Sequence, residues 1–177
     1  HLGINDTDPR NWPNYRDEFV KDYLSIMDSL RAVNPKVRFI IARMTPIADR
    51  HPRFISGTKL WHGEIQTAIE TVARVSGAEL IDFHEPMYPY PNLLPDAIHP
   101  NPEGAGILAK TVYGGITGNY GGLKVSELYT DYMVLQRNVP LDIHGTANAG
   151  ENVSVSINGQ TATAIANNQG KWTVELK

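Results

Sequence analysis

The sequence predicts an α/β layer with a parallel sheet, followed by a partial all-β module. Two observations lead to this fold class. Up to about residue 117, stretches with the apolar spacing of a helix alternate with short apolar runs rich in branched side chains. Beyond a glycine-rich segment, short alternating runs are separated by Asn-Gly and similar turns, which is typical of a β-meander.

Two stretches have the spacing of amphipathic helices, at residues 13–34 and 59–75, since their apolar side chains fall on one face. A third helix is expected over about 102–113, because Pro102 and Glu103 suit a helix start. Asn34-Pro35 ends the first helix, because proline cannot continue it. Asn101 is the expected N-cap of the third.

Two short apolar runs, Val37–Thr45 and Ala78–Phe83, predict buried parallel strands. An irregular loop is expected between them at residues 47–58. The polar loops at residues 3–8 and 94–101 each follow a predicted strand. Because parallel sheets bind ligands outside the carboxyl ends of their strands, we expect these two loops to converge there.

The glycine-rich segment Gly114–Gly122 is interpreted as a linker. Because no strand precedes it and no helix follows it, a phosphate-binding loop is not favoured. Five runs beyond it predict short strands: Tyr132–Arg137, Pro140–His144, Asn152–Asn158, Thr161–Ala166 and Lys171–Leu176. So few strands bury two faces poorly. The opening residues also lack the character of a natural start, and we expect the chain to be a fragment of a longer protein.

Composition excludes several classes of function. The 177 residues are 41% hydrophobic and 20% charged, as in ordinary globular proteins. The net charge of −3, without a basic block, argues against nucleic-acid and anionic-membrane partners. The absence of cysteine excludes disulfides, thiolate metal sites and a cysteine nucleophile. No apolar run approaches membrane-spanning length.

The most informative stretch is Leu94-Pro-Asp-Ala-Ile-His-Pro-Asn-Pro-Glu-Gly, which carries Asp96 and His99 on a proline-rich loop. Its prolines restrict the backbone, so the loop has few conformations to lose. A carboxylate three residues before a histidine can accept a hydrogen bond from the ring Nδ1–H, which leaves Nε2 free as a base. In the alternative, Asp96 only caps a turn and His99 is an ordinary surface imidazole. Taken alone, so short a motif favours that alternative.

Leu2-Gly3-Ile4-Asn5-Asp6-Thr7, followed at a distance by Asp96-Ala-Ile-His99-Pro-Asn, resembles the SGNH (GDSL-type) hydrolase family over residues 1 to about 117. The resemblance implies an incomplete SGNH-hydrolase-like (flavodoxin-like) parallel sheet with helices on both faces. It also implies that His99 is the general base, Asp96 its orienting carboxylate and Asn5 a donor to the oxyanion hole. The alternative for Asn5 is an Asx-turn that closes its loop.

Two parts of the family pattern are missing from the chain. The family's Gly-Asp-Ser nucleophile block and its block with an oxyanion-hole glycine both precede the Asn block, and no Gly-Asp-Ser or Gly-x-Ser-x-Gly occurs here. Ser56 and Ser76 precede glycines and are interpreted as structural. The resemblance therefore implies a nucleophile upstream of His1, or on a separate N-terminal fragment that docks non-covalently.

A second resemblance covers residues 123–177. Tyr132-Met-Val-Leu-Gln-Arg-Asn-Val-Pro-Leu-Asp-Ile-His-Gly, with Val153-Ser-Val-Ser-Ile-Asn-Gly and Gly170-Lys-Trp-Thr-Val, is similar to the opening β-region of sialate O-acetylesterase-type proteins. The implied organisation is the C-terminal part of an SGNH hydrolase domain over residues 1–117, a glycine-rich linker over 118–122 and a partial β-sandwich-like module over 123–177.

Together the two resemblances imply part of a serine carbohydrate esterase that removes O-acetyl groups from sialate, xylan or other polysaccharides. Its partner would be an acetylated carbohydrate, and its location secreted or periplasmic. Two other hypotheses stay open. A non-catalytic carbohydrate-binding or structural fragment is favoured by the missing nucleophile, whereas the β-region argues against an SGNH lipase or thioesterase.

Other polar side chains carry weaker signals. His51, with Arg50 and Arg53, could line a sugar pocket, although a solvated loop is favoured. His62 and His84 have no partners at metal-ligand spacing, so a metal site is not supported. We expect no metal and no organic cofactor, because a serine triad needs neither.

Aromatic side chains could contribute to sugar binding by stacking. Trp12, Trp61 and Tyr88 are candidates, although aromatics on helix faces more often belong to the core. Trp172 is expected to pack within the β-region.

Overall fold

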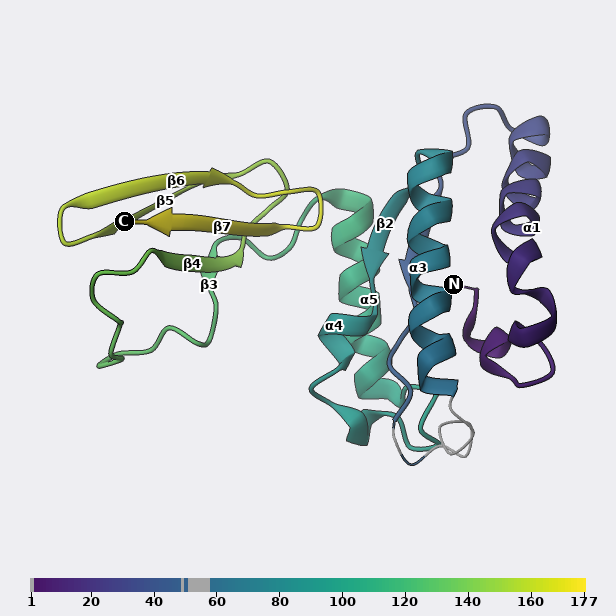
Figure 1. Ribbon diagram of the computed structural model, residues 1–177. Helices are drawn as coiled ribbons and strands as arrows, with labels where there is room; N and C mark the ends of the chain where they lie inside the picture. Colours follow the sequence, from purple (N-terminus) through teal and green to yellow (C-terminus); the bar gives the residue numbers. More distant parts are fainter. Residues whose placement is uncertain (1, 49, 51–57) are drawn as a thin grey trace. The chain divides into compact units, whose positions relative to one another are not determined.

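The computed structural model describes residues 2–48, 50 and 58–177, and Figure 1 shows its path. The chain divides into two compact units, residues 1–109 and 110–177. Most of the irregular loop predicted at residues 47–58, including His51, Arg53 and Ser56, lies outside the described residues.

The first unit contains helices and two short strands. In chain order they are η1 (Ile4–Thr7), α1 (Trp12–Val33), β1 (Ile40–Arg43), α3 (Thr58–Ser76), β2 (Glu79–Asp82), α4 (His84–Met87), η2 (Pro91–Leu93) and the first half of α5 (Pro102–Thr117), which continues into the second unit. The helices predicted at residues 13–34 and 59–75 are confirmed as α1 and α3. The short helices η1, α4 and η2 interrupt segments that the sequence indicates as loops.

Strands β1 and β2 pair in parallel, from Ile40 opposite Glu79 to Arg43 opposite Asp82. This confirms the parallel pairing, but both strands are shorter than the apolar runs that predict them. Directly after β1, the backbone of Met44 is hydrogen-bonded to the side chain of Gln66 and not to a neighbouring strand. Its Oε1 accepts the Met44 amide at 2.8 Å, and its Nε2 donates to the Met44 carbonyl at 3.1 Å.

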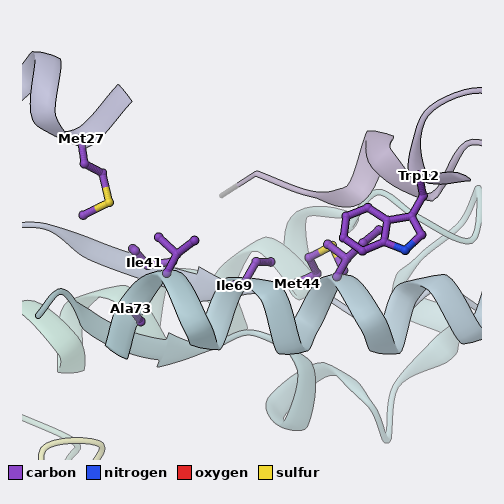
Figure 2. Close-up of a cluster of buried hydrophobic side chains, with 8 residues drawn as sticks. Trp12, Met27, Ile41, Met44, Ile69 and Ala73 are labelled. Carbon is purple, nitrogen blue, oxygen red and sulfur yellow. The ribbon is translucent and has the colours of Figure 1, made fainter. Parts of the chain in front are cut away.

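The core of the first unit lies between α1, α3 and β1. Helix α1 packs on α3, and α3 packs on both strands. The buried side chains are Trp12, Met27, Ile41, Met44, Ile65, Ile69, Val72 and Ala73. Figure 2 shows Met27 and Trp12 at opposite ends of this cluster, with Ile69 between them on α3. The periodic apolar face of each helix therefore accounts for the packing.

A smaller core supports the loop between β2 and α5. Its buried side chains are Met87, Leu93 and Leu94, packed against Ile107 and Leu108. Gly104, in the first turn of α5, permits this close approach, since a Cβ there would lie 3.0 Å from Pro100 Cβ and from Met87 Cε. The loop that carries Asp96 and His99 is thus anchored by apolar contacts on both sides.

Helix α5 continues to Thr117, so the linker predicted from Gly114 is wrong at its start. The missing side chain at Gly114 makes room for the Tyr120 ring, because a Cβ there would lie 2.5 Å from Tyr120 Cε1. The helix ends where Gly118 adopts a φ of 73° and its amide donates to the Gly114 carbonyl at 2.7 Å.

The second unit is built from antiparallel strands: β3 (Lys124–Val125), β4 (Leu141–Thr146), β5 (Asn152–Ile157), β6 (Gln160–Ile165) and β7 (Lys171–Leu176). Strands β3, β4 and β7 form one sheet, and β5 and β6 form a hairpin. The hairpin turn predicted at Asn158-Gly is confirmed, with φ values of 49° and 80° at Asn158 and Gly159.

One predicted strand in this unit is wrong. Tyr132–Arg137 is irregular, because Tyr132 and the following Asn138 have φ values of 64° and 61°, which no strand accommodates. The core forms from other residues, which are Ile143, Ala147, Val153, Ala166, Trp172, Val174 and Leu176. Trp172 is 3% exposed, which confirms that it packs within the β-region.

Within the part of the chain that the structure describes, no helix combines the length and the apolar character needed to cross a bilayer.

Candidate active site

Asp96 and His99 lie on the loop between η2 and α5, where Asp96 accepts three hydrogen bonds. Its Oδ1 accepts the backbone amides of Ile98 at 3.0 Å and of His99 at 2.7 Å. Its Oδ2 lies 2.6 Å from His99 Nδ1. Because an ionised carboxylate can only accept, the proton of the neutral imidazole is assigned to Nδ1. Nε2 of His99 therefore keeps its lone pair.

The same hydrogen bonds lower the pKa of Asp96 below its ordinary value. The backbone amide of His99 has the largest effect, followed by the His99 ring and the Ile98 amide. Asp96 is therefore ionised at neutral pH, as an orienting carboxylate must be. The pair is open to solvent, since the side chains of Asp96 and His99 are 57% and 77% exposed.

Ala97, between the two residues, adopts an unusual backbone conformation. Its φ is 72°, in the left-handed region that residues other than glycine seldom occupy, and the residue is 2% exposed. Its amide donates to the Leu94 carbonyl at 2.8 Å, and its carbonyl accepts the Ala48 amide at 2.9 Å. This conformation brings the carboxylate of Asp96 back over the amides of the residues that follow it.

The start of α5 fixes the other end of the loop. The Asn101 side chain accepts the Gly104 amide at 2.9 Å, which confirms the predicted N-cap. The Asn101 amide donates to the Leu93 carbonyl at 2.8 Å. His99 is therefore held between a buried turn and a capped helix.

Asn5 lies on η1 with an exposed side chain. Its backbone carbonyl closes the turn, by accepting the Asp8 amide at 3.2 Å and Asn11 Nδ2 at 3.0 Å. Among the described residues, the Asn5 side chain has no hydrogen bond, so it does not form the Asx-turn of the alternative interpretation. Its amide is available as a donor.

Asp6, next to Asn5, is half-buried. Burial raises the pKa of its carboxyl, an effect that a backbone hydrogen bond partly offsets.

The Asn5 loop and the Asp96 loop both attach to the segment that follows β1. Gly3 packs so tightly that a Cβ there would lie 2.9 Å from Met44 Sδ and from Ile65 Cγ2. The Asp96 loop is joined to the same segment by the hydrogen bond between Ala97 and Ala48. In Figure 1, η1 and the loop after η2 lie towards the end of the strand pair to which the arrows of β1 and β2 point.

Two histidines lie close to the segment that follows β1. His62 is 8% exposed, and its Nε2 lies 3.0 Å from the Thr45 carbonyl. Burial lowers the pKa of His62. The His84 ring, from the start of α4, lies 5.8 Å from the His62 ring. Among the described residues, no three His, Asp or Glu side chains are grouped to hold a metal ion.

The remaining candidates have different environments. Trp12 is 5% exposed and Trp61 packs against the core, whereas Tyr88 is 67% exposed. The Arg50 guanidinium donates to the carbonyls of Pro91 and Leu94. It therefore braces the loop that leads to Asp96.

Sequence reasoning missed Ala48 and Ala97, which support the pair through a backbone hydrogen bond between distant parts of the chain. It named Arg50 for a possible sugar pocket, whereas the structure shows its guanidinium on the carbonyls of Pro91 and Leu94. No local signal marks Ala97, because alanine seldom adopts the left-handed backbone that this turn requires.

An oriented imidazole on a loop beyond the carboxyl ends of parallel strands is an arrangement typical of α/β hydrolytic enzymes. The family model for the GDSL-like lipase/acylhydrolase family matches residues 1–107. The chain belongs to this family of acylhydrolases and esterases. A search of curated proteins and a search of solved structures gave no significant match. The family match ends before the β-region, whose kinship is therefore not identified.

Proposed function

We propose that the chain is part of a serine carbohydrate esterase that removes O-acetyl groups from sugars. The observation that carries this proposal is the 2.6 Å contact between His99 Nδ1 and Asp96 Oδ2, which leaves an exposed Nε2 as a base. The sugar ester is preferred to a lipid ester because of the resemblance of residues 123–177 to the β-region of sialate O-acetylesterase-type proteins.

In the proposed reaction, the nucleophile is a serine outside these 177 residues, on an upstream segment or a separate N-terminal fragment. His99 Nε2 takes the serine proton as the oxygen attacks the acetyl carbonyl. The Asn5 amide donates to the oxyanion that forms. When the intermediate collapses, His99 returns the proton to the departing sugar oxygen. His99 then takes a proton from water, which attacks the acetyl-enzyme, and returns that proton to the serine oxygen as the acyl–oxygen bond breaks and acetate leaves.

Two features of the first unit are compatible with an additional strand. Among the described residues, β1 has a strand neighbour on one edge only, although its central residues Ile41 and Ala42 are buried. Gly3 packs on Met44, directly after β1, so a chain leading into Gly3 would approach the end of that strand. Parallel sheets are normally covered on both faces and extended beyond two strands.

A secreted or periplasmic location is part of the proposal, because polysaccharide substrates lie outside the cytoplasm.

The test is acetate release from acetylated xylan and from O-acetylated sialic acid, by a chain extended upstream to include the segment with the serine. We expect turnover that His99→Ala abolishes and Asp96→Asn reduces by about three or four orders of magnitude. Asp17→Asn is the matched control, since this carboxylate is 94% exposed on α1. A folded, extended protein that releases no acetate from either substrate would exclude the proposal.

The alternative is a non-catalytic carbohydrate-binding or structural fragment, favoured by the absence of a Gly-Asp-Ser block from the sequence. It predicts glycan binding by the 177-residue chain, together with an extended protein whose properties do not depend on His99. Hydrolysis that depends on His99 would contradict it.

A further inference from the structure

The segment between β2 and the Asp96 loop has some fully buried side chains and some largely exposed ones. Met87 and Leu94 are fully buried, whereas Tyr88 and Tyr90 are 67% and 48% exposed. Both tyrosines therefore lie on the surface of a segment whose apolar side chains form a core beneath them. Such an aromatic surface, on the segment that leads into the Asp96 loop, raises the question of what it contacts.

The Tyr88 ring is held in place before any ligand arrives. It stacks on the His84 ring, with centroids 5.4 Å apart and an interplanar angle of 28°. The Tyr88 amide donates to the His84 carbonyl at 2.9 Å, and the His84 amide donates to Asp82 Oδ1 at 2.8 Å. A ring that is already ordered loses little freedom when a ligand covers its other face.

A series of tight turns connects the tyrosines to the catalytic pair. The Tyr90 carbonyl accepts the Leu93 amide at 3.0 Å, and the Leu94 carbonyl accepts the Ala97 amide at 2.8 Å. Each such turn keeps its end residues within about 7 Å. The Arg50 guanidinium donates to the carbonyls of Pro91 and Leu94, between the two turns. Tyr90, just after Tyr88, is thus connected to His99 by one braced segment.

The groups around the tyrosines indicate a ligand with both apolar and polar faces. Glu85, whose side chain is 60% exposed, lies beside His84 Nδ1 at 3.4 Å, and the tyrosines carry their own hydroxyls. An acyl chain would meet charge at this rim, whereas a pyranose ring offers C–H groups to the aromatic faces and hydroxyls to the rim.

We propose that Tyr88 and Tyr90 form a stacking platform for a pyranose ring of the substrate. This inference rests on the proposed function, because the platform would hold the sugar of that substrate for reaction at His99. It assigns specificity for the sugar to the α4–η2 segment and the chemistry to the loop that follows.

The test is an NMR titration of the 177-residue chain with xylohexaose and, separately, with sialyllactose. We expect one of these glycans to bind and to shift the resonances of residues 84–91. Tyr88→Ala and Tyr90→Ala should each weaken that binding by about fivefold, and the double variant by more. Tyr88→Phe should retain most of the affinity, because the ring remains. Tyr15→Ala removes a ring that is 63% exposed on α1 and should leave the affinity unchanged.

Three results would overturn the platform: binding of neither glycan, affinity that the double variant does not change, or preferential binding of octanoate at the tyrosines. Failure of the proposed function is a separate result. In that case the extended protein releases no acetate, while glycan binding that depends on the tyrosines persists, also in His99→Ala. Conversely, if the extended protein is an active esterase but the double variant keeps its glycan affinity, the proposed function holds and the platform is wrong.

Discussion

The carbonyl of Ala97 accepts a hydrogen bond from the amide of Ala48 at 2.9 Å, although the two residues belong to different loops. Both residues are buried, at 2% and 7% exposure. The bond joins the segment after β1 to the turn that holds Asp96 against His99. The geometry of the candidate active site therefore depends on a long-range backbone contact as well as on a local motif.

Substitutions at Ala97 test how much the stability of this turn depends on its backbone conformation. At a φ of 72°, Ala97→Val places a branched side chain in the left-handed region and in a buried site. We expect it to destabilise the first unit by about 1–3 kcal/mol. Ala97→Gly removes the Cβ penalty and should change stability by less than about 1 kcal/mol. Urea denaturation measures both, and equal losses in the two variants would contradict the prediction.

Asp96 should make the stability of the protein depend on pH in the acid range. Its pKa is lowered in the folded state by the hydrogen bonds from His99 and Ile98, so the unfolded chain binds its proton first as the pH falls. The stabilisation is complete above the ordinary pKa of about 4 and is lost as the pH falls below it. Urea denaturation between pH 5 and pH 2 should give a shallower dependence for Asp96→Asn than for the wild type.

The tautomer of His99 offers an independent check on the same pair. In the wild type, nitrogen NMR shifts should show the proton of the neutral ring on Nδ1. In Asp96→Asn that preference should be lost, because the acceptor at 2.6 Å has been replaced. A proton on Nε2 in the wild type would contradict the proposed role of His99 as a base.

The local features of the fold were predictable from sequence, because a single element determines them. The apolar periodicity of α1 and α3, the N-cap at Asn101 and the turn at Asn158 all follow from residues close together in the chain. The spacing of Asp96 and His99 is local in the same sense, so their hydrogen bond could be predicted, whereas the catalytic role predicted for the pair rests on the family resemblance.

Features set by distant contacts were not predictable. Gly114 lies in α5, and the Tyr120 ring occupies the space that a side chain there would fill; a glycine-rich segment alone does not distinguish this from a linker. The predicted strand at Tyr132–Arg137 is an apolar run that suits a strand, but left-handed backbones at Tyr132 and Asn138 lie at its two ends. The hydrogen bonds between Ala97 and Ala48 and between Gln66 and Met44 join segments that no short motif connects.

Gly3 tests the packing that places the Asn5 loop. Its φ is 116°, and a Cβ would lie 2.9 Å from side-chain atoms of Met44 and Ile65. Gly3→Ala should therefore destabilise the first unit by about 1–3 kcal/mol. Gly63→Ala is the matched control, because nothing lies within 4 Å of a Cβ at that position in α3. There the substitution should stabilise by about 0.5–1 kcal/mol, as in other helix interiors. Thermal and urea denaturation report both, and a neutral Gly3→Ala would refute the close approach.

His62 gives the last prediction, which concerns mildly acid pH. Burial lowers the pKa of its imidazole in the folded state, and the positive groups His84 and Arg43 act in the same direction, while the hydrogen bond with Thr45 opposes them. The unfolded chain therefore binds the His62 proton first as the pH falls below about 6.5, so the folded state loses stability there. His62→Gln retains a donor for the Thr45 carbonyl at 3.0 Å but cannot titrate. Unfolding free energies measured from pH 8 to pH 5 should fall more steeply for the wild type than for His62→Gln, and identical slopes would show that the imidazole is not buried as described.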